Sequence, residues 1–165
     1  MDMTFDGLFS NEELQSLIPH RGKMLLLSRV KEYNPTEGHL CAEYDITKEC
    51  IFYDPLVKGV PTWAGFEFMA QAISVLSGIK DSAKGIKPRM GFILSIPSMK
   101  IHVPFFKLGN HVEVRVKEND CVDLVYNFDG EAFLEGKKVM EGKLMVMEID
   151  EERMNSLIKE NSFVK

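Results

Sequence analysis

Hydrophobic positions along the first third of the chain change from a helical to an alternating pattern. Ser10 and Glu13 have the spacing of a capping box, which predicts a short helix over Asn11–Leu17. The segments 24–33 and 39–45 have the composition of strands, and residues typical of a turn separate them. Together these two segments predict a β-hairpin.

The last third of the chain has the pattern of a meandering sheet. Apolar and polar residues alternate strictly over 111–117, and the pattern continues over 122–134 and 138–149. Such alternation is typical of antiparallel strands that are buried on one face. A short amphipathic helix is expected near 152–159.

Between these two regions lies a segment that is apolar nearly all round. It predicts one long helix over about 62–79, with Pro61 just before it and Gly78 near its end. Glycines, a proline and two polar residues interrupt this run, which argues against the alternative of a membrane span. A helix of this kind is instead enclosed by the rest of the fold. We therefore expect an α+β fold, one domain over residues 1–165, with a curled antiparallel sheet wrapped around a central helix, as in the hotdog fold.

Composition and charge narrow the class of protein. The net charge is −5 and the pI is about 5.4, so nucleic acid is not an expected partner. Three cysteines without a CxxC pair, and an acidic N-terminus unlike a signal peptide, indicate a reduced cytoplasmic protein. No metal-ligand spacing or cofactor motif occurs, so neither a metal nor a cofactor is expected.

The charges are segregated along the sequence. Residues 80–107 hold six Lys or Arg against one Asp, whereas 118–152 hold eleven acids against three lysines. One interpretation is that both runs form solvated faces of the protein. The alternative, for the basic run, is that it attracts an acidic or phosphorylated partner. The basic residues in question are Lys84, Lys87, Arg89, Lys100 and Lys107.

Glu67 is the only charged residue between Lys58 and Lys80. Taking an ionised carboxylate out of water costs several kcal/mol, so it requires a partner or a role at a reacting centre. The helical period places it on one face with Trp63 and with small or polar residues, which are Ala70, Gln71, Ser74 and Gly78. That face either lets another backbone pack closely or lines a narrow slot that contains a single acid.

Four segments carry motifs that occur in the same order in one family. They are 17–30 (LIPHRGKMLLLSRV), 66–72 (FEFMAQA), 91–94 (GFIL) and 99–110 (MKIHVPFFKLGN). In this order they resemble the bacterial β-hydroxyacyl-acyl-carrier-protein dehydratases of fatty-acid synthesis. Among these, the chain is most similar to the dehydratase-like hotdog proteins of aryl-polyene and related polyketide clusters.

This resemblance implies a homodimer or a higher dimer-based oligomer with acyl slots at the subunit interface. The substrate would be a 3-hydroxyacyl thioester of acyl carrier protein or CoA, which loses water. In the family a His takes the α-proton and a helix carboxyl, matched here by Glu67, protonates the departing hydroxyl. A carboxyl kept dry on a central helix suits this role. The resemblance also implies substrate contacts from Pro61, Thr62, Trp63 and Gln71.

The sequence departs from the family pattern in the loop before the helix. The family's catalytic His is missing from 49–55, where the alignment places either Cys50 or Tyr53. Tyr53 and Asp54 are therefore our candidates to act with Glu67, because Cys50 has no cationic neighbour in sequence to activate it. The remaining histidines are interpreted as surface or hydrogen-bonded structural residues, namely His20, His39, His102 and His111.

Three functions follow from these observations. The first is a 3-hydroxyacyl thioester dehydratase that uses Glu67, with Tyr53, Asp54 or a residue of a partner chain completing the site. The second is a non-catalytic subunit that binds acyl carrier protein or a His-bearing hotdog chain in a heteromer. The third is a hotdog acyl-thioesterase, which needs only the helix carboxylate.

Overall fold

The computed structural model describes residues 7–161. The predicted capping box at the first helix is confirmed, because the Ser10 side chain accepts from the Glu13 amide and the Glu13 carboxylate accepts from the Ser10 amide. The elements, with 3-10 turns labelled η, are α1 (Asn11–Leu17), η1 (Gly22–Met24), β1 (Arg29–Asn34), β2 (His39–Asp45), β3 (Gly59–Pro61), η2 (Thr62–Ala64), α2 (Gly65–Ala83), β4 (Met90–Ile101), β5 (Phe105–Lys107), β6 (His111–Val122), β7 (Val125–Leu134), β8 (Lys137–Ile149) and α3 (Glu151–Asn161).

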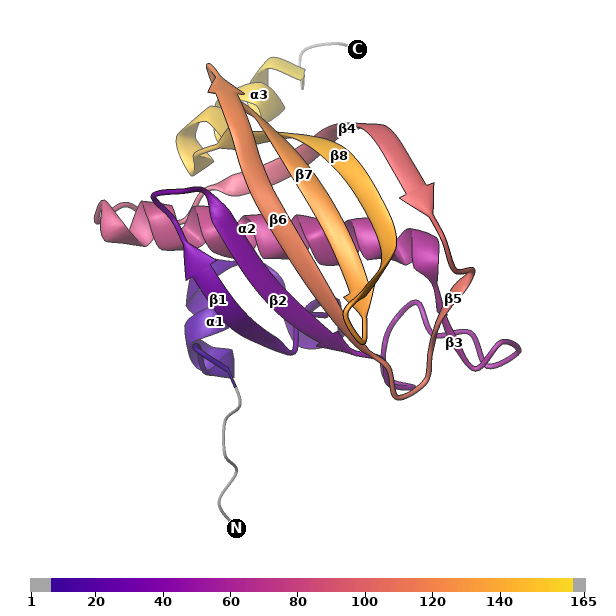
Figure 1. Cartoon of the computed structure of the whole chain (residues 1–165). Helices are drawn as coiled ribbons and strands as arrows, with labels where there is room; N and C mark the ends of the chain where they lie inside the picture. The colour runs from indigo at the N-terminus through magenta and orange to yellow at the C-terminus, as the bar shows by residue number, and fades with distance from the viewer. Residues whose placement is uncertain (1–6, 162–165) are drawn as a thin grey trace.

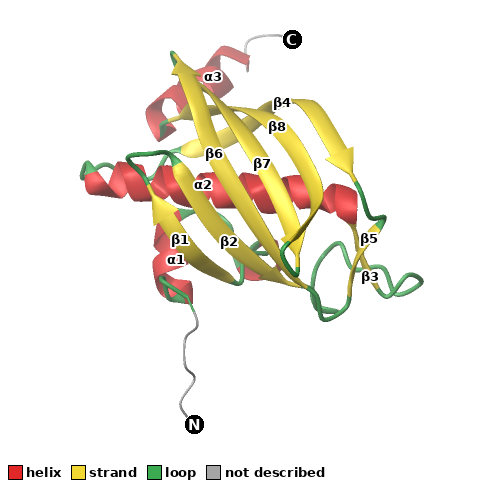
Figure 2. Cartoon of the chain, viewed as in Figure 1, coloured by secondary structure: helices red, strands yellow, loops and turns green. Residues whose placement is uncertain are grey.

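Six strands form one antiparallel sheet in the order β1-β2-β6-β7-β8-β4, and β3 pairs separately with β5. The sheet curls over α2, which runs across the strands (Figure 1). The same view coloured by secondary structure shows α2 covered by the sheet, with α1 beside the β1 edge (Figure 2). The predicted hotdog arrangement of one central helix and a curled antiparallel sheet is confirmed.

The core lies between α2 and the sheet. Phe68, Met69 and Ala72 of α2 are almost completely buried there. Tyr44 of β2 stacks on Phe68 with ring centroids 4.5 Å apart, and its hydroxyl donates to the Phe68 carbonyl at 2.5 Å. This pairing satisfies the polar end of a fully buried tyrosine and fixes the rotation of α2 against the sheet.

The central helix is longer than predicted. It begins with the 3-10 turn η2 and continues to Ala83, although Gly78 was expected near its end. Gly78 serves close packing instead, because a Cβ built there would lie 2.2 Å from the Leu17 carbonyl oxygen of α1. Within residues 7–161 no helix is both long and apolar enough to cross a membrane.

The first strand of the predicted hairpin starts five residues later than expected. Residues 22–24 form η1, and β1 begins at Arg29. The Leu26 amide donates to the Gln71 side chain of α2 at 3.0 Å rather than to a neighbouring strand. The segment between η1 and β1 is thus tied to the helix, which matters for the site described below.

The free edge of the sheet at β4 is long and apolar. β4 stands last in the strand order and its register pairs it with β8 alone. Several of its apolar side chains are exposed, including Met90 (43%), Phe92 (36%) and Leu94 (49%). An unpaired edge of this kind is a template for pairing with another chain.

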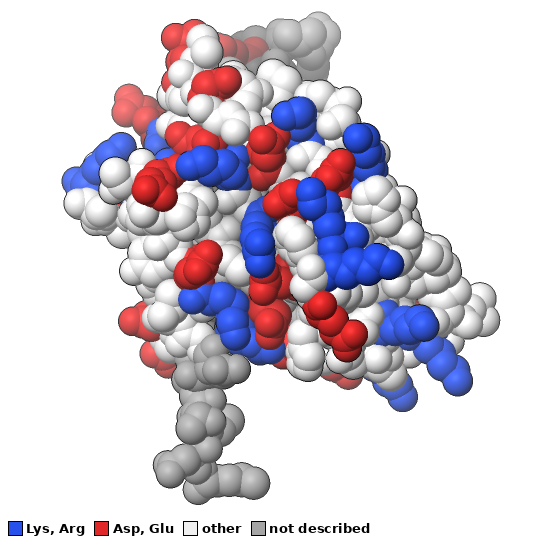
Figure 3. Space-filling view, viewed as in Figure 1, with Lys and Arg blue, Asp and Glu red and all other residues white. Residues whose placement is uncertain are grey.

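Charged side chains of both signs alternate over the outer face of the sheet (Figure 3). The basic segment 80–107 forms no uniform patch, because Lys87 pairs with Glu151 at 2.9 Å and Lys100 with Glu141 at 3.4 Å. Beside β3 and β5 the same view shows positive charge with few acidic neighbours (Figure 3). Lys107 of β5 belongs to this pair of strands and has no ion pair within the described part of the chain.

Candidate active site

Glu67 stands in the first turn of α2, with a side chain that is 20% exposed. One helical turn later, the Gln71 Nε2 donates to the Glu67 Oε1 at 3.1 Å. The same Nε2 donates to the Met24 carbonyl at 2.8 Å, and the Gln71 Oε1 accepts from the Leu26 amide. Gln71 is completely buried, so these bonds orient Glu67 and fasten the segment 24–26 to α2.

His20 lies beside Glu67. Its Nε2 is 3.6 Å from the Glu67 Oε1, and its side chain is 24% exposed. Its Nδ1 is buried without a hydrogen-bond partner. The sequence suggested a surface or a hydrogen-bonded structural role for His20, whereas the structure places it beside Glu67 with one buried, unpaired ring nitrogen. The available signal was its place in the Leu-Ile-Pro-His-Arg motif that resembles the dehydratases.

The segment that carries His20 is held by its neighbour Arg21. The Arg21 guanidinium donates to three backbone carbonyls, those of Gln15 at 2.6 Å, Ile18 at 2.7 Å and His20 at 2.8 Å. Since α1 also packs its C-terminal carbonyl against Gly78, the path from α1 to His20 is fixed at two places. His20 is therefore positioned by the crossing of α1 over α2.

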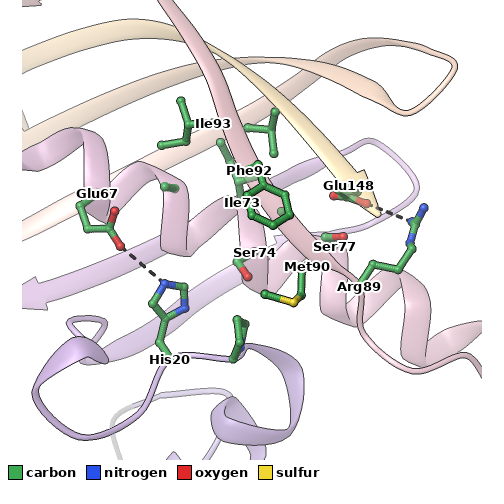
Figure 4. Close-up of a pocket in the computed structure, with 14 residues that line it drawn as sticks. His20, Glu67, Ile73, Ser74, Ser77, Arg89, Met90, Phe92, Ile93 and Glu148 are labelled. Carbon is green, nitrogen blue, oxygen red and sulfur yellow. Dashed lines mark ion pairs between the residues drawn. The ribbon is translucent and has the colours of Figure 1, made fainter. Parts of the chain in front are cut away.

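A cavity of about 280 Å³ opens beside the His20–Glu67 pair. Figure 4 shows that pair at one end, Ile73, Phe92 and Ile93 along the middle, and Arg89 with Glu148 at the other end. An apolar slot with a few polar groups is typical of a ligand site. Its lining residues are Pro19, His20, Glu67, Ala70, Ile73, Ser74, Ser77, Arg89, Met90, Gly91, Phe92, Ile93, Val146 and Glu148.

Tyr53 and Asp54, which the sequence analysis placed with Glu67, do not line this cavity. The Asp54 carboxylate accepts from the Leu56 amide at 2.8 Å, and its backbone pairs with Gly59. The Tyr53 ring packs against the edge of the core. Within the single chain these residues close the loop before β3, and their catalytic role stays a prediction.

The other predicted substrate contacts lie at the start of the central helix. Pro61 caps η2, Thr62 is buried with its hydroxyl unpaired, and Trp63 is 51% exposed. The Trp63 ring packs edge-on against Phe52 with centroids 5.7 Å apart. None of the three lines the cavity, whereas Gln71 acts through Glu67, so their contact with substrate stays a prediction.

Burial raises the pKa of the Cys50 thiol, and a hydrogen bond from the Phe52 backbone lowers it by less. A thiol with a raised pKa is mostly protonated at neutral pH and is a weak nucleophile. The structure therefore gives no support to Cys50 as a catalytic group.

Among residues 7–161, one cluster has the composition of a metal site, and it lies outside the cavity. Glu43, Asp45 and His111 bring their potential ligand atoms within 4.8 Å of one another. The Arg29 guanidinium occupies the space between the two carboxylates, with its Nε 2.8 Å from Glu43 and its Nη1 3.0 Å from Asp45. A cation already balances these acids, so the cluster is explained as an ion-pair network.

Comparison with known proteins agrees with the resemblance seen in the sequence. A sequence model of the ApeP-like family, described as ApeP dehydratase, matches residues 12–159. The 3-hydroxyacyl-[acyl-carrier-protein] dehydratase FabZ of Campylobacter fetus is 31% identical over 144 residues, or 84% of this chain and 96% of that protein.

Solved structures show the same fold. A chain of the dehydratase heterocomplex ApeI:P from Xenorhabdus doucetiae superposes with a TM-score of 0.80 at 22% identity, covering 88% of this chain and 96% of that chain. A hypothetical thioesterase with coenzyme A from Streptococcus pneumoniae matches with a TM-score of 0.57 at 10% identity, covering 74% of this chain and 85% of that chain. At these identities the likeness concerns the fold alone.

Proposed function

We propose, from the premise that this chain belongs to the ApeP-like dehydratase family, that it removes water from a 3-hydroxyacyl thioester to give a 2-enoyl thioester. The observation that carries the proposal is Glu67, a carboxyl at the end of an apolar slot, oriented by Gln71 and faced by His20. The FabZ relatives, named as 3-hydroxyacyl-[acyl-carrier-protein] dehydratases, support the same substrate class.

The chemistry needs one base and one acid on adjacent substrate carbons. The C2–H bond breaks and its electrons form the C2–C3 double bond, while the C3–O bond breaks and the oxygen leaves as water. In our proposal the His20 Nε2 takes the C2 proton and the Glu67 carboxyl protonates the leaving hydroxyl. The 3.6 Å between the two groups is longer than a hydrogen bond and suits two atoms attached to bonded neighbours.

The sheet edge at β4 supports an assembly with a second hotdog chain. Met90, Phe92 and Ile93 of β4 are exposed apolar residues and also line the slot. A chain that pairs with this edge would cover those residues and close the slot against water. We propose a dimer-based oligomer in which the partner is a second copy or a His-bearing hotdog chain.

Delivery by acyl carrier protein is the proposed route for the substrate. The exposed Lys58 and Lys107 lie at one end of the β3–β5 pair, where Gly59 is registered with Lys107 and the Leu108 amide donates to the Lys58 carbonyl at 3.0 Å. Neither has an ion pair among residues 7–161, so both are available to an acidic carrier or to the phosphate of its pantetheine arm. A cytoplasmic location is proposed with it, since all three cysteines are free.

A non-catalytic partner subunit is the second candidate. The loop before β3 lacks a histidine at the position where the resembling family has its base, and this observation favours that candidate. In that case the chain would stabilise a complete hotdog partner and bind the acyl carrier. The similar chain from Xenorhabdus doucetiae belongs to a complex that is named a dehydratase heterocomplex.

The experiment is mass-spectrometric detection of water loss from a panel of 3-hydroxyacyl carrier-protein thioesters. We expect turnover by the wild type and a loss of at least about 100-fold in Glu67→Gln, because one general acid contributes roughly that much. The matched control is Glu32→Gln, at an exposed position of β1, which is expected to keep the wild-type rate. Absence of turnover by a folded wild type, alone and with a His-bearing hotdog chain, would reject the catalytic proposal and leave the partner role.

A further inference from the structure

The end of the slot remote from Glu67 is built from charged and polar side chains. Ser77 of α2, Arg89 just before β4 and Glu148 of β8 meet there (Figure 4). The same three side chains also line a second cavity of about 180 Å³. They therefore stand between two cavities and form the end wall of the slot.

The charge of Arg89 is already balanced by Asp81. The Arg89 Nε lies 3.0 Å from one carboxylate oxygen of Asp81, its Nη2 lies 2.9 Å from the other, and Asp81 is completely buried. Glu148 adds a second buried carboxyl, with its Oε2 3.0 Å from the same Nη2. Two carboxyl groups thus share one guanidinium, so this end of the slot has more carboxyl groups than cationic groups among Asp81, Arg89 and Glu148.

Burial supports this description of Glu148. Loss of solvent raises the pKa of the Glu148 carboxyl, with smaller opposing effects from Ser77 and Arg89. A wall of this kind repels a second anion and accepts a hydrogen bond from a neutral donor. The Glu148 carboxyl is paired with Arg89 at 3.0 Å, and a carboxyl group has acceptor sites left for one further donor.

The distance along the slot sets the length of a chain that reaches this wall. Glu67 and Ser77 are ten residues apart on α2, which corresponds to about 15 Å along the helix axis. A hydrogen bond to the wall takes up about 3 Å of this distance. An extended zigzag carbon chain with bonds of ~1.5 Å covers the remainder with roughly ten bonds. A chain of about this length would bring its far end to Glu148 while its reacting carbons lie at Glu67.

We infer that Ser77, Arg89 and Glu148 form a specificity site for an uncharged hydroxyl at the far end of the acyl chain, with Glu148 as the acceptor. The inference rests on the proposed function, since it places the thioester end of the same chain at Glu67. It assigns the substrate to acyl groups that end in a neutral hydrogen-bond donor rather than in a methyl or a carboxylate.

The test compares kcat/KM for three 3-hydroxyacyl carrier-protein thioesters of equal length, which end in a hydroxyl, a methyl or a carboxylate. For the wild-type assembly we expect a preference of about tenfold or more for the hydroxyl over the methyl, since only the hydroxyl can donate to the acceptor sites of the Glu148 carboxyl that Arg89 leaves open. The carboxylate is expected to be the poorest of the three. Equal values for hydroxyl and methyl would overturn the inference.

The variant is Glu148→Met, which removes the acceptor and leaves the Arg89–Asp81 pair in place. We expect the preference for the hydroxyl over the methyl to fall to about twofold or less; a preference that stays at the wild-type value would overturn the inference. Ser77→Ala, which leaves both carboxyl groups, is expected to lower the preference in part and covers the case in which Glu148→Met does not fold.

Failure of the proposed function is recognised separately. If no thioester is turned over, calorimetry compares binding of acyl-pantetheines that end in a hydroxyl or a methyl and lack the 3-hydroxyl group. Tighter binding of the hydroxyl form, lost in Glu148→Met, supports the end-wall site in a non-catalytic chain. Equal binding rejects it.

Discussion

The crossing of α1 over α2 depends on one missing side chain, at Gly78. A Cβ there would lie 2.2 Å from the Leu17 carbonyl oxygen and 3.0 Å from its carbon. The obstacle is backbone, so it cannot rotate away as a side chain would. His20 follows Leu17 by three residues, and a displacement of this segment therefore moves His20 away from Glu67.

The expected cost of Gly78→Ala has two opposing parts. Alanine in a helix interior gains about 1 kcal/mol over glycine. Overpacking of a tight core costs typically about 1–3 kcal/mol, and a backbone clash belongs at the upper end of that range. The net loss in the free energy of unfolding is then about 2 kcal/mol, which lowers the Tm of a chain of this size by about 4–8 °C.

The assay is thermal unfolding combined with dehydration kinetics. Besides the lower Tm, we expect kcat to fall by at least tenfold, because a misplacement of about 1 Å is costly in an oriented site. The control is Ser82→Ala, at an exposed position of the same helix, which is expected to change stability by less than about 0.5 kcal/mol. A Gly78→Ala protein with the Tm and kcat of this control would refute the reasoning.

Three further predictions concern the interface, the orientation of Glu67 and the dependence on pH. Leu94→Glu in β4 is expected to dissociate the oligomer in light scattering, whereas Val122→Glu, at a position that is 67% exposed on β6, leaves its mass unchanged; a dimeric Leu94→Glu protein would contradict the interface. Gln71→Leu leaves the Leu26 amide and the Met24 carbonyl unpaired, so denaturant unfolding is expected to show a loss of about 2–4 kcal/mol, and an unchanged midpoint would contradict this. Burial raises the pKa of Asp45, but hydrogen bonds from Arg29 and His111 outweigh it and hold the pKa below the ordinary value of 3.8. The unfolded state therefore binds more protons in this range, so stability is lost as the pH falls below about 4; Asp45→Asn is expected to flatten that part of the stability curve, and a slope equal to the wild type would count against the ion pair.

The fold could be predicted from the sequence because the capping signals, the alternating strand patterns and the apolar helix all indicated the same arrangement. The capping box, the alternating strands and the one apolar helix are all found in the structure. The boundaries that differed are places where a tertiary contact decides the local conformation. Gly78 continues the helix because α1 needs its missing Cβ, and the segment before β1 leaves the sheet because Gln71 binds Leu26.

Only some residues of the site could be predicted from the sequence. Glu67 and Gln71 were found from helical spacing and motif, since the two lie one turn apart on the same helix. His20 reaches Glu67 through the crossing of two helices, and Glu148 reaches the slot from the last strand. Contacts between residues so distant in the chain leave no periodic signal, and the order of strands in the sheet had to be known before they could be placed.

The most direct test of the central claim is a double-mutant cycle of Glu67→Gln and His20→Gln, measured as kcat/KM for one 3-hydroxyacyl carrier-protein thioester. If the two groups act together on one substrate, each single variant is expected to lose at least about 100-fold, and the double variant little more than either. The proposed acid–base pair would be contradicted if the loss of kcat/KM in the double variant equalled the product of the losses in the two single variants. A Glu67→Gln protein with the wild-type kcat/KM would also contradict it.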